Sequence, residues 1–223
     1  MNVSEAVASR RSIRAFLDKP VEARVLREVL EKAQRAASGG NLQPWHGVIL
    51  SGEPLERLKA HIAAVLPEGR SAWEQDYVIY PEALADPYEA RRVAVGEAMY
   101  GAMGIAREDK RGRLAQFVAN FRAFDAPVLM LVHMPRYMGP PQWSDIGMWL
   151  QTVMLLLREQ GLDSCAQEAW SVYHSRIREV VGLPDDHLFF CGLAIGYRDP
   201  DAAVNLFDVA RAPLEEAIRF EGF

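Results

Sequence analysis

The sequence predicts an α+β fold, a sandwich in which helices flank a mixed central sheet. Apolar residues recur at helical spacing over 21–37, which indicates an amphipathic helix. The continuous apolar run at 127–132 is typical of an inner strand. Four short strand-like segments are separated by helical segments of unequal length, which favours an α+β sandwich. We expect a single domain over residues 1–223, since no internal repeat or low-complexity segment interrupts the chain.

The chain is predicted to begin with a short helix. Asn2 and Glu5 have the spacing of a capping box, and the helix ends just before Arg10. The amphipathic helix of 21–37 follows and stops at the Ser-Gly-Gly-Asn loop of 38–41, because glycine-rich stretches favour loops.

A short buried strand is predicted at 48–50 and a second amphipathic helix at 55–65. The stretch 67–112 has a different character, because three prolines break it and large aromatic and methionine side chains fill it. We expect a helical excursion from the core. Its large side chains either line a pocket or pack the excursion against the rest of the protein, and both interpretations carry equal weight.

The second half is predicted to contain helices at 113–124, 146–157 and 174–181, and strands at 127–132, 164–166 and 188–195. The central helix of 146–157 is apolar almost all round, so we expect protein on all its sides. Gly182 closes the last of these helices, and the segment after the final strand leaves the core.

Composition limits the possible functions. Half of the 223 residues are hydrophobic, which suffices for a large core. The 25 basic and 30 acidic side chains give a net charge of -5 without a long basic stripe, which argues against a general nucleic-acid binder. No segment has the pattern of a secretory signal or a membrane span, so we expect a cytoplasmic protein without a membrane partner. Cys165 and Cys191 are expected to be separate buried thiols.

Several familiar site motifs are absent. The chain has no G-x-G-x-x-G after a strand, no G-x-x-x-x-G-K-[ST] and no G-x-S-x-G, so the Rossmann, P-loop and hydrolase fingerprints are missing. The five histidines are scattered without ligand spacing. We therefore expect no metal site and assign each histidine a surface or packing role.

The most informative stretch is Arg10-Arg11-Ser12-Ile13-Arg14, which combines three guanidiniums and a hydroxyl. Guanidiniums match phosphate oxygens in geometry, and a hydroxyl with backbone N–H groups can complete the shell. The stretch is therefore a candidate phosphate site. The alternative is a basic cap, in which Arg10 and Arg11 complement the dipole of the N-terminal helix, and the stretch alone favours neither.

Two further segments have features of a ligand site. Residues 38–45 combine two glycines, two amides and Trp45, which can bring backbone and a flat apolar surface to a ligand. The alternative is a loop after a helix with a buried tryptophan. Residues 165–170 place small side chains at a bend, where backbone N–H groups can meet a planar ligand, although as a bare strand end this signal is weak.

Together and in this order, these segments resemble the nitroreductase family of FMN-dependent oxidoreductases. The segments are RRSIRAF, SGGNLQPWH, CAQEAW and GLAIGYRDPDAAVNLF, followed by Arg211. The resemblance spans nearly the whole chain and is nearest to the nitrobenzoate and nitroaromatic reductases. Ala166 stands where proline is frequent, which implies a less rigid bend. Val209 stands where some members have another basic residue, which implies fewer charges at the phosphate.

The resemblance implies a nitroreductase-like three-layer sandwich and an intertwined homodimer with two FMN sites, each built from both chains. Arg10, Ser12 and Arg211 would hold the FMN phosphate, with Arg11 against the same end. Arg14 would approach the N1 and C2 carbonyl side of the ring, where a cation favours the reduced flavin. The other cofactor-binding residues would be Ser38, Gly39, Gly40 and Gln43 of the partner chain, and Gln167, Glu168 and Ala169, whose backbone N–H groups would face N5. Of all these residues, the expected catalytic ones are Arg14, Glu168 and Ala169.

The activity implied by the resemblance is ping-pong hydride transfer. NADH or NADPH would reduce FMN and leave, and a nitroaromatic or quinone-like acceptor would then enter the same cleft. The excursion at 67–112 would cover this cleft. Two alternatives are reduction or dehalogenation of another conjugated substrate and a flavin-binding module without turnover, because fold analogy does not determine substrate.

Overall fold

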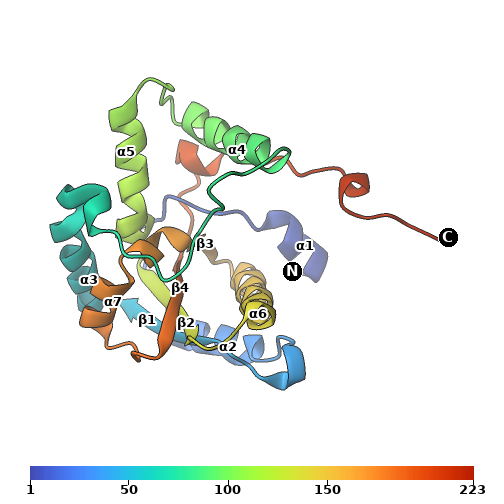
Figure 1. The fold of residues 1–223 in the computed structure, drawn as a ribbon, viewed down its shortest axis with the longest axis horizontal. Helices are drawn as coiled ribbons and strands as arrows, with labels where there is room; N and C mark the ends of the chain where they lie inside the picture. The colour runs from blue at the N-terminus through green and yellow to red at the C-terminus, as the bar shows by residue number, and fades with distance from the viewer.

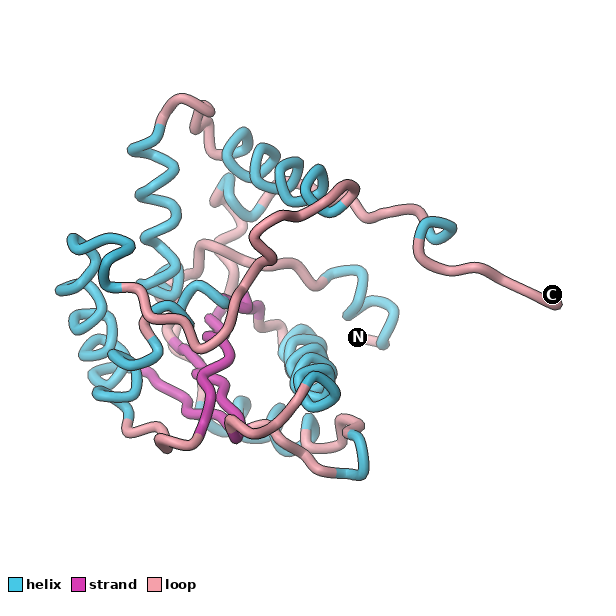
Figure 2. Tube along the Cα trace, in the orientation of Figure 1, coloured by secondary structure: helices cyan, strands magenta, loops and turns pink.

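Four strands form one central sheet in the computed structural model of residues 1–223, and helices surround it (Figures 1 and 2). The strand order is β1-β2-β4-β3, with β1 at His46–Ser51, β2 at Val128–Pro135, β3 at Asp163–Gln167 and β4 at His187–Gly196. The seven α-helices are α1 (Val3–Ser9), α2 (Ala23–Ala33), α3 (Gly52–Val65), α4 (Tyr88–Ala102), α5 (Lys110–Val118), α6 (Pro140–Glu159) and α7 (His174–Val181).

All neighbouring strands run antiparallel, so the expected mixed sheet is wrong. Parallel contacts occur only as isolated bridges, one between Ser12 and Ser164 and another between Glu74 and Tyr173. The prediction failed because helices cover both faces of this sheet. Strand β2 is therefore as uniformly apolar and buried as a strand of a parallel sheet.

Each face of the sheet carries its own hydrophobic core, which gives the molecule three layers (Figure 1). Leu129 and Leu131 of β2 share a cluster with Leu58 and Ile62 of α3 and with Ile177 of α7. The alternate residues of β2 belong to a second cluster, which α2 and α6 fill. Successive strand side chains point to opposite faces, and burial of each large apolar side chain contributes about 1.5–3 kcal/mol.

Most of the predicted elements are confirmed. The capping box of Asn2 and Glu5 starts α1, and Gly182 ends α7 in a left-handed conformation. All four expected strands are present. Helix α2 is shorter than the expected 21–37, and α6 extends beyond the expected 146–157 at both ends.

The helix expected at 113–124 is wrong in its last part. Helix α5 ends at Val118, and three consecutive residues with positive φ follow at Ala123, Phe124 and Asp125. Phe121 and Phe124 are both buried, so apolar residues continue at a spacing that a helix would also show. A left-handed turn, which the apolar pattern does not reveal, brings them into the core.

Several elements remain uncovered within one chain. Helix α6 has exposed positions at Gly147, Met148 and Gln151, so its own chain does not cover it on all sides. Helices α4 and α5 have no buried residue. The tail beyond Asn205 is almost wholly exposed and runs away from the body (Figure 1). None of the helices combines the length and apolar character that a membrane crossing requires.

Candidate functional site

A cleft of about 560 Å³ lies where the N-terminal segment meets the tail. Four guanidiniums and a hydroxyl line it, and they belong to Arg10, Arg11, Ser12, Arg14 and Arg211. The only carboxylate in the lining is that of Asp208. The structure thus brings together every residue that the sequence analysis assigned to a phosphate, although Arg211 is far from the others in the sequence.

The local backbone explains why the arginines of residues 10–14 reach the cleft. Helix α1 ends at Ser9 without a basic residue in its last turn, and the chain continues in an extended conformation. Ile13 is fully buried, and its backbone N–H donates to the carbonyl of Ser164 at 3.1 Å. With Ile13 held inward, the flanking polar side chains line the cleft. This geometry favours the phosphate site over the helix-cap alternative.

The tail supplies the opposite wall of the cleft through 204–211. Arg11 joins the two walls, because its Nη2 donates to Oδ1 of Asp208 at 2.8 Å and its Nη1 donates to the carbonyl of Phe207 at 3.2 Å. Arg211 bonds only carbonyls of its own segment through Nη1, at 3.0 and 3.1 Å. Its guanidinium keeps donors for an anion.

A second pocket, of about 670 Å³, lies beside the bend after β3. Its lining includes Glu168 and Ala169 of the bend, Trp73 and Tyr80 of the excursion, and Phe117 of α5. Burial raises the pKa of the Glu168 carboxyl. The arginine stretch adjoins the start of β3 and the bend follows its end, so a strand length of roughly 13 Å separates the two places.

Gln167 enters this arrangement differently from its neighbours. Its side chain is only 2 % exposed and turns into the protein. The Nε2 donates to the backbone carbonyl of Asn120 at 2.9 Å and to its Oδ1 at 3.2 Å, and the Oε1 accepts from Nε1 of Trp170 at 3.3 Å. The side chain therefore fastens the bend, and only its backbone can face a ligand.

The glycine loop is a separate feature of the chain. Backbone N–H groups of Gly39 and Gln43 donate to Oδ1 of Asp145 at 3.1 Å and to Oγ of Ser38 at 3.0 Å. Gly40 and Gln43 have positive φ, which only glycine adopts without strain. The loop lines neither pocket of its own chain.

Trp45, just after this loop, is buried as the alternative interpretation expects. Its ring stacks on Trp149 of α6 with centroids 5.8 Å apart, and its Nε1 donates to Oε1 of Gln34 at 2.9 Å. Trp45 therefore anchors the loop to α2 and α6 and does not offer a flat surface to a ligand.

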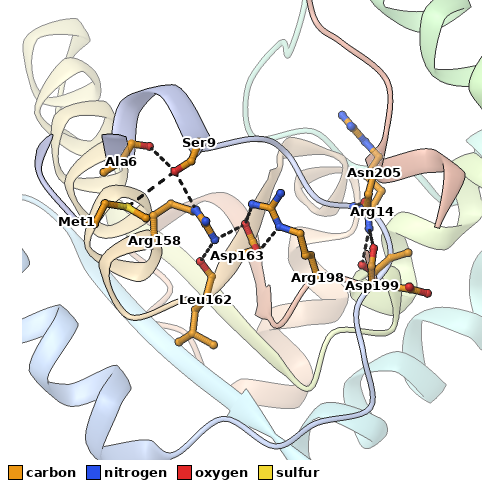
Figure 3. A network of polar contacts seen from close by, with 11 residues as sticks. Met1, Ala6, Ser9, Arg14, Arg158, Leu162, Asp163, Arg198, Asp199 and Asn205 are labelled. Carbon is orange, nitrogen blue, oxygen red and sulfur yellow. Dashed lines mark hydrogen bonds and ion pairs between the residues drawn. The ribbon is translucent and has the colours of Figure 1, made fainter. Parts of the chain in front are cut away.

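A buried ion cluster beside the cleft was missed by the sequence analysis (Figure 3). Asp163, 2 % exposed, accepts from Nη1 of Arg158 at 2.9 Å and from Nε and Nη2 of Arg198 at 2.8 and 2.7 Å. Nε of Arg158 also donates to Oγ of Ser9 at 3.4 Å. The cluster joins α1, α6 and β3, and Ser9 and Arg198 are far from the Arg158–Asp163 pair in the sequence.

Three of the five histidines also come together, which their spacing did not indicate. Nδ1 of His133 lies 2.8 Å from Nδ1 of His187, and the ring centroid of His46 lies 4.7 Å from that of His187. Burial, followed by the nearby charge of His187, lowers the pKa of His133 to about 4. The chain holds no cluster of three or more side chains with the geometry of a metal site.

Comparison with known proteins supports the earlier resemblance. Residues 7–197 match the nitroreductase family. The chain is 33 % identical to the chloronitrobenzene nitroreductase of Comamonas testosteroni, covering 98 % of this chain and 96 % of that protein. It is 34 % identical to the 4-nitrobenzoate reductase of Pseudomonas putida, covering 97 % and 94 %.

Solved structures agree with these relatives. The fold superposes with a TM-score of 0.98 and 51 % identity on the FMN and NADPH-dependent nitroreductase NfnB from Sphigopyxis sp. strain HMH, over 100 % of both chains. The FMN-dependent nitroreductase NfnB from Mycobacterium smegmatis, solved in complex with NADPH, gives a TM-score of 0.91 with 31 % identity over 99 % of this chain and 100 % of that one.

Proposed function

This chain belongs to the nitroreductase family, and we propose that it transfers hydride from NADPH, through bound FMN, to nitroaromatic compounds. The observation that carries the proposal is the cleft in which Arg10, Arg11, Ser12, Arg14 and Arg211 converge. The named activities of the similar proteins supply the chemistry, and the cleft supplies a place for its cofactor.

The residues of the cleft fit the phosphate of FMN. The lining contains four guanidiniums and only one carboxylate, so the cleft has an excess of positive charge that a phosphate dianion would neutralise. Charge-assisted hydrogen bonds to phosphate are worth about 1.5–3 kcal/mol each. Arg10, Ser12 and Arg211 hold the phosphate in this proposal, and Arg11 lies against the same end.

The rest of the cofactor site follows the direction of β3. Arg14 places a cation beside the ring, and the backbone of Glu168 and Ala169 presents N–H groups to the reacting edge. When bound, FMN supplies the hydride-accepting and hydride-donating group. The second pocket admits flat molecules next to this bend, and Trp73 and Tyr80 of the excursion limit access of water to it. Protons can come from water, so no protein acid is required.

The site is completed by a second copy of the chain in this proposal. Ser38, Gly39, Gly40 and Gln43 line neither pocket of their own chain, which supports a role in the partner's site. The exposed positions of α6, the uncovered helices α4 and α5 and the extended tail offer the surface for an intertwined homodimer. Such an obligate interface buries more than about 2,000 Å².

The purified protein should be yellow, with one noncovalent FMN per chain. Arg211→Ala should weaken FMN binding by roughly tenfold to a hundredfold, because it loses a charge-assisted hydrogen bond. Arg107→Ala is the matched control, since Arg107 is exposed in the excursion and lines neither pocket. Fluorescence titration of apoprotein with FMN measures both constants, and equal effects would place the phosphate elsewhere.

The activity and the dimer have separate tests. Stopped-flow bleaching with NADPH and with NADH, followed by reoxidation with a nitroaromatic and a quinone, should show faster reoxidation by the nitroaromatic than by oxygen. Reoxidation by neither acceptor faster than by oxygen would favour a flavin-binding module. Sedimentation of the FMN-loaded protein should give a dimer, and a stable FMN-loaded monomer would exclude a shared site.

A further inference from the structure

We infer that Asn205 is a positioning residue for the flavin site: its side-chain amide fastens the backbone on both sides of Arg14 to the tail and so aims the Arg14 guanidinium. The inference rests on the proposed function, because it assigns Asn205 a role at the site where FMN binds. Asn205 lies within the segment GLAIGYRDPDAAVNLF, between Val204 and Leu206, and its spacing alone indicates no role.

The amide of Asn205 is buried, with 6 % of the residue exposed, and all its polar atoms are engaged (Figure 3). Its Oδ1 accepts from the backbone N–H of Arg14 at 2.8 Å. Its Nδ2 donates to the carbonyls of Ala15 and Asp199, both at 2.9 Å. One side chain thus joins the segment of Arg14 and Ala15 to Asp199.

The arginine stretch needs such a partner because it has no helix or continuous strand to hold it. Ile13 is fixed on one side, where its N–H bonds to β3. The next N–H, that of Arg14, points to the other side, and Asn205 receives it as a neighbouring strand would. Fixing consecutive peptide groups from opposite sides determines the direction in which the Arg14 side chain leaves the backbone.

Asn205 also sets the distance between the two walls of the cleft. It stands in a short 3-10 turn, Ala203–Asn205, beside the buried Val204, and the residues that follow carry Asp208 and Arg211. Its bonds to Arg14 and Ala15 therefore locate the second wall relative to the first. Loss of the amide should loosen the cleft while leaving in place the arginines and the hydroxyl that would hold the phosphate.

Asn205→Asp is the sharpest variant, because the shape is kept while both N–H donors are lost. A carboxylate would then face the carbonyls of Ala15 and Asp199, which repel it. Because Asn205 lines the cleft, Asn205→Asp also adds a like charge near the phosphate. Asn205→Ser loses the amide without adding a charge and so isolates the positioning effect. Ile62→Val is the control, since it removes one core methyl group from a side chain that takes no part in the hydrogen bonds of Asn205.

Three measurements test the inference. Hydrogen exchange on apoprotein should show faster exchange of the Arg14 amide in Asn205→Ser, whose shorter side chain withdraws the acceptor, and not in the control. Asn205→Asp keeps an acceptor oxygen for this N–H and should change its exchange less. FMN titration should show a roughly tenfold to hundredfold higher Kd for the neutral variant Asn205→Ser as well as for Asn205→Asp. The midpoint potential of bound flavin should fall, and it should fall much less when the substitution is made in an Arg14→Ala background, because coupled residues are not additive.

The outcomes separate the inference from the proposed function. Wild-type apoprotein without affinity for FMN would overturn the proposed function, whereas faster exchange of the Arg14 amide in Asn205→Ser would still support the clamp, the set of hydrogen bonds by which Asn205 holds Arg14 and Ala15. Wild-type protein that binds FMN, with the Kd and potential unchanged in Asn205 variants, would overturn the positioning role. Equal potential shifts in the presence and absence of Arg14 would show that Asn205 does not act through that arginine.

Discussion

Arg11 is the guanidinium of the cleft that already has a carboxylate partner. The partner, Asp208, has a side chain that is 91 % exposed, so solvent and salt weaken the pair. Exposed pairs of this kind contribute only about 0–1 kcal/mol. In the proposed site, a phosphate would displace Asp208 from Arg11 at small cost, and the displaced carboxylate would stay nearby as a like charge.

Asp208→Asn should strengthen FMN binding, because it removes that like charge while keeping the side-chain shape. The expected gain is up to about fivefold in Kd and should shrink at high salt. Titration of apoprotein at two salt concentrations measures it. Asp201→Asn is the control, an exposed acid of the tail region outside the cleft, and an equal gain in both variants would indicate a general charge effect.

At the scale of elements, β3 and the bend that follows it organise the candidate site. The ion cluster of Asp163 holds the start of the strand, and the side chain of Gln167 fastens its end. Ala166 lies just before the bend, and the bonds of Gln167 to Asn120 and Trp170 limit the freedom of this bend. The same bonds explain why Gln167 does not face the pocket with its side chain.

Gln167→Leu should destabilise the protein by about 1–3 kcal/mol, because the Asn120 carbonyl and the Trp170 N–H lose their buried partner. It should also slow hydride transfer from NADPH more than it changes FMN affinity, since the phosphate end is untouched. Urea unfolding and stopped-flow bleaching measure the two effects. Gln160→Leu at the end of α6 is the control, and matching losses in both variants would contradict a specific role of the bend.

Strands β1, β2 and β4 bring three histidines together, and this cluster makes the stability of the fold depend on pH. The pKa of His133 is lowered to about 4 in the folded protein, below its ordinary value. The unfolded chain therefore binds a proton first as pH falls. The stability due to neutral His133 is complete above its unfolded pKa, about 6.5, and is lost as pH falls through that value toward about 4.

His133→Gln should therefore flatten the pH dependence of the unfolding free energy between about pH 6.5 and 4, where one proton contributes up to about 1.4 kcal/mol per pH unit. Urea unfolding at several pH values measures the slope in each protein. His61→Gln, at a more exposed histidine that contacts Glu179, is the control. A wild-type slope in His133→Gln would assign the acid sensitivity to other groups.

At the scale of the whole molecule, the sequence predicted what is periodic or local. Helices, strands, the capping box and the arginine stretch depend on residues close in the chain, and the structure contains them. Strand direction was not predictable, because helices on both faces make β2 uniformly apolar. The turn at Ala123, the histidine cluster and the clamp of Asn205 depend on contacts between distant segments, which no spacing encodes.

The cleft is assembled from opposite ends of the chain. Its first wall is residues 10–14, and its second wall comes from 204–211, after the last strand of the sheet ends at Gly196. During translation all four strands are therefore synthesised before the residues that close the cleft. A phosphate-bearing ligand can therefore bind only after the whole sheet has been synthesised. A chain whose synthesis stopped between Gly196 and Val204 would contain all four strands but only the first wall of the cleft.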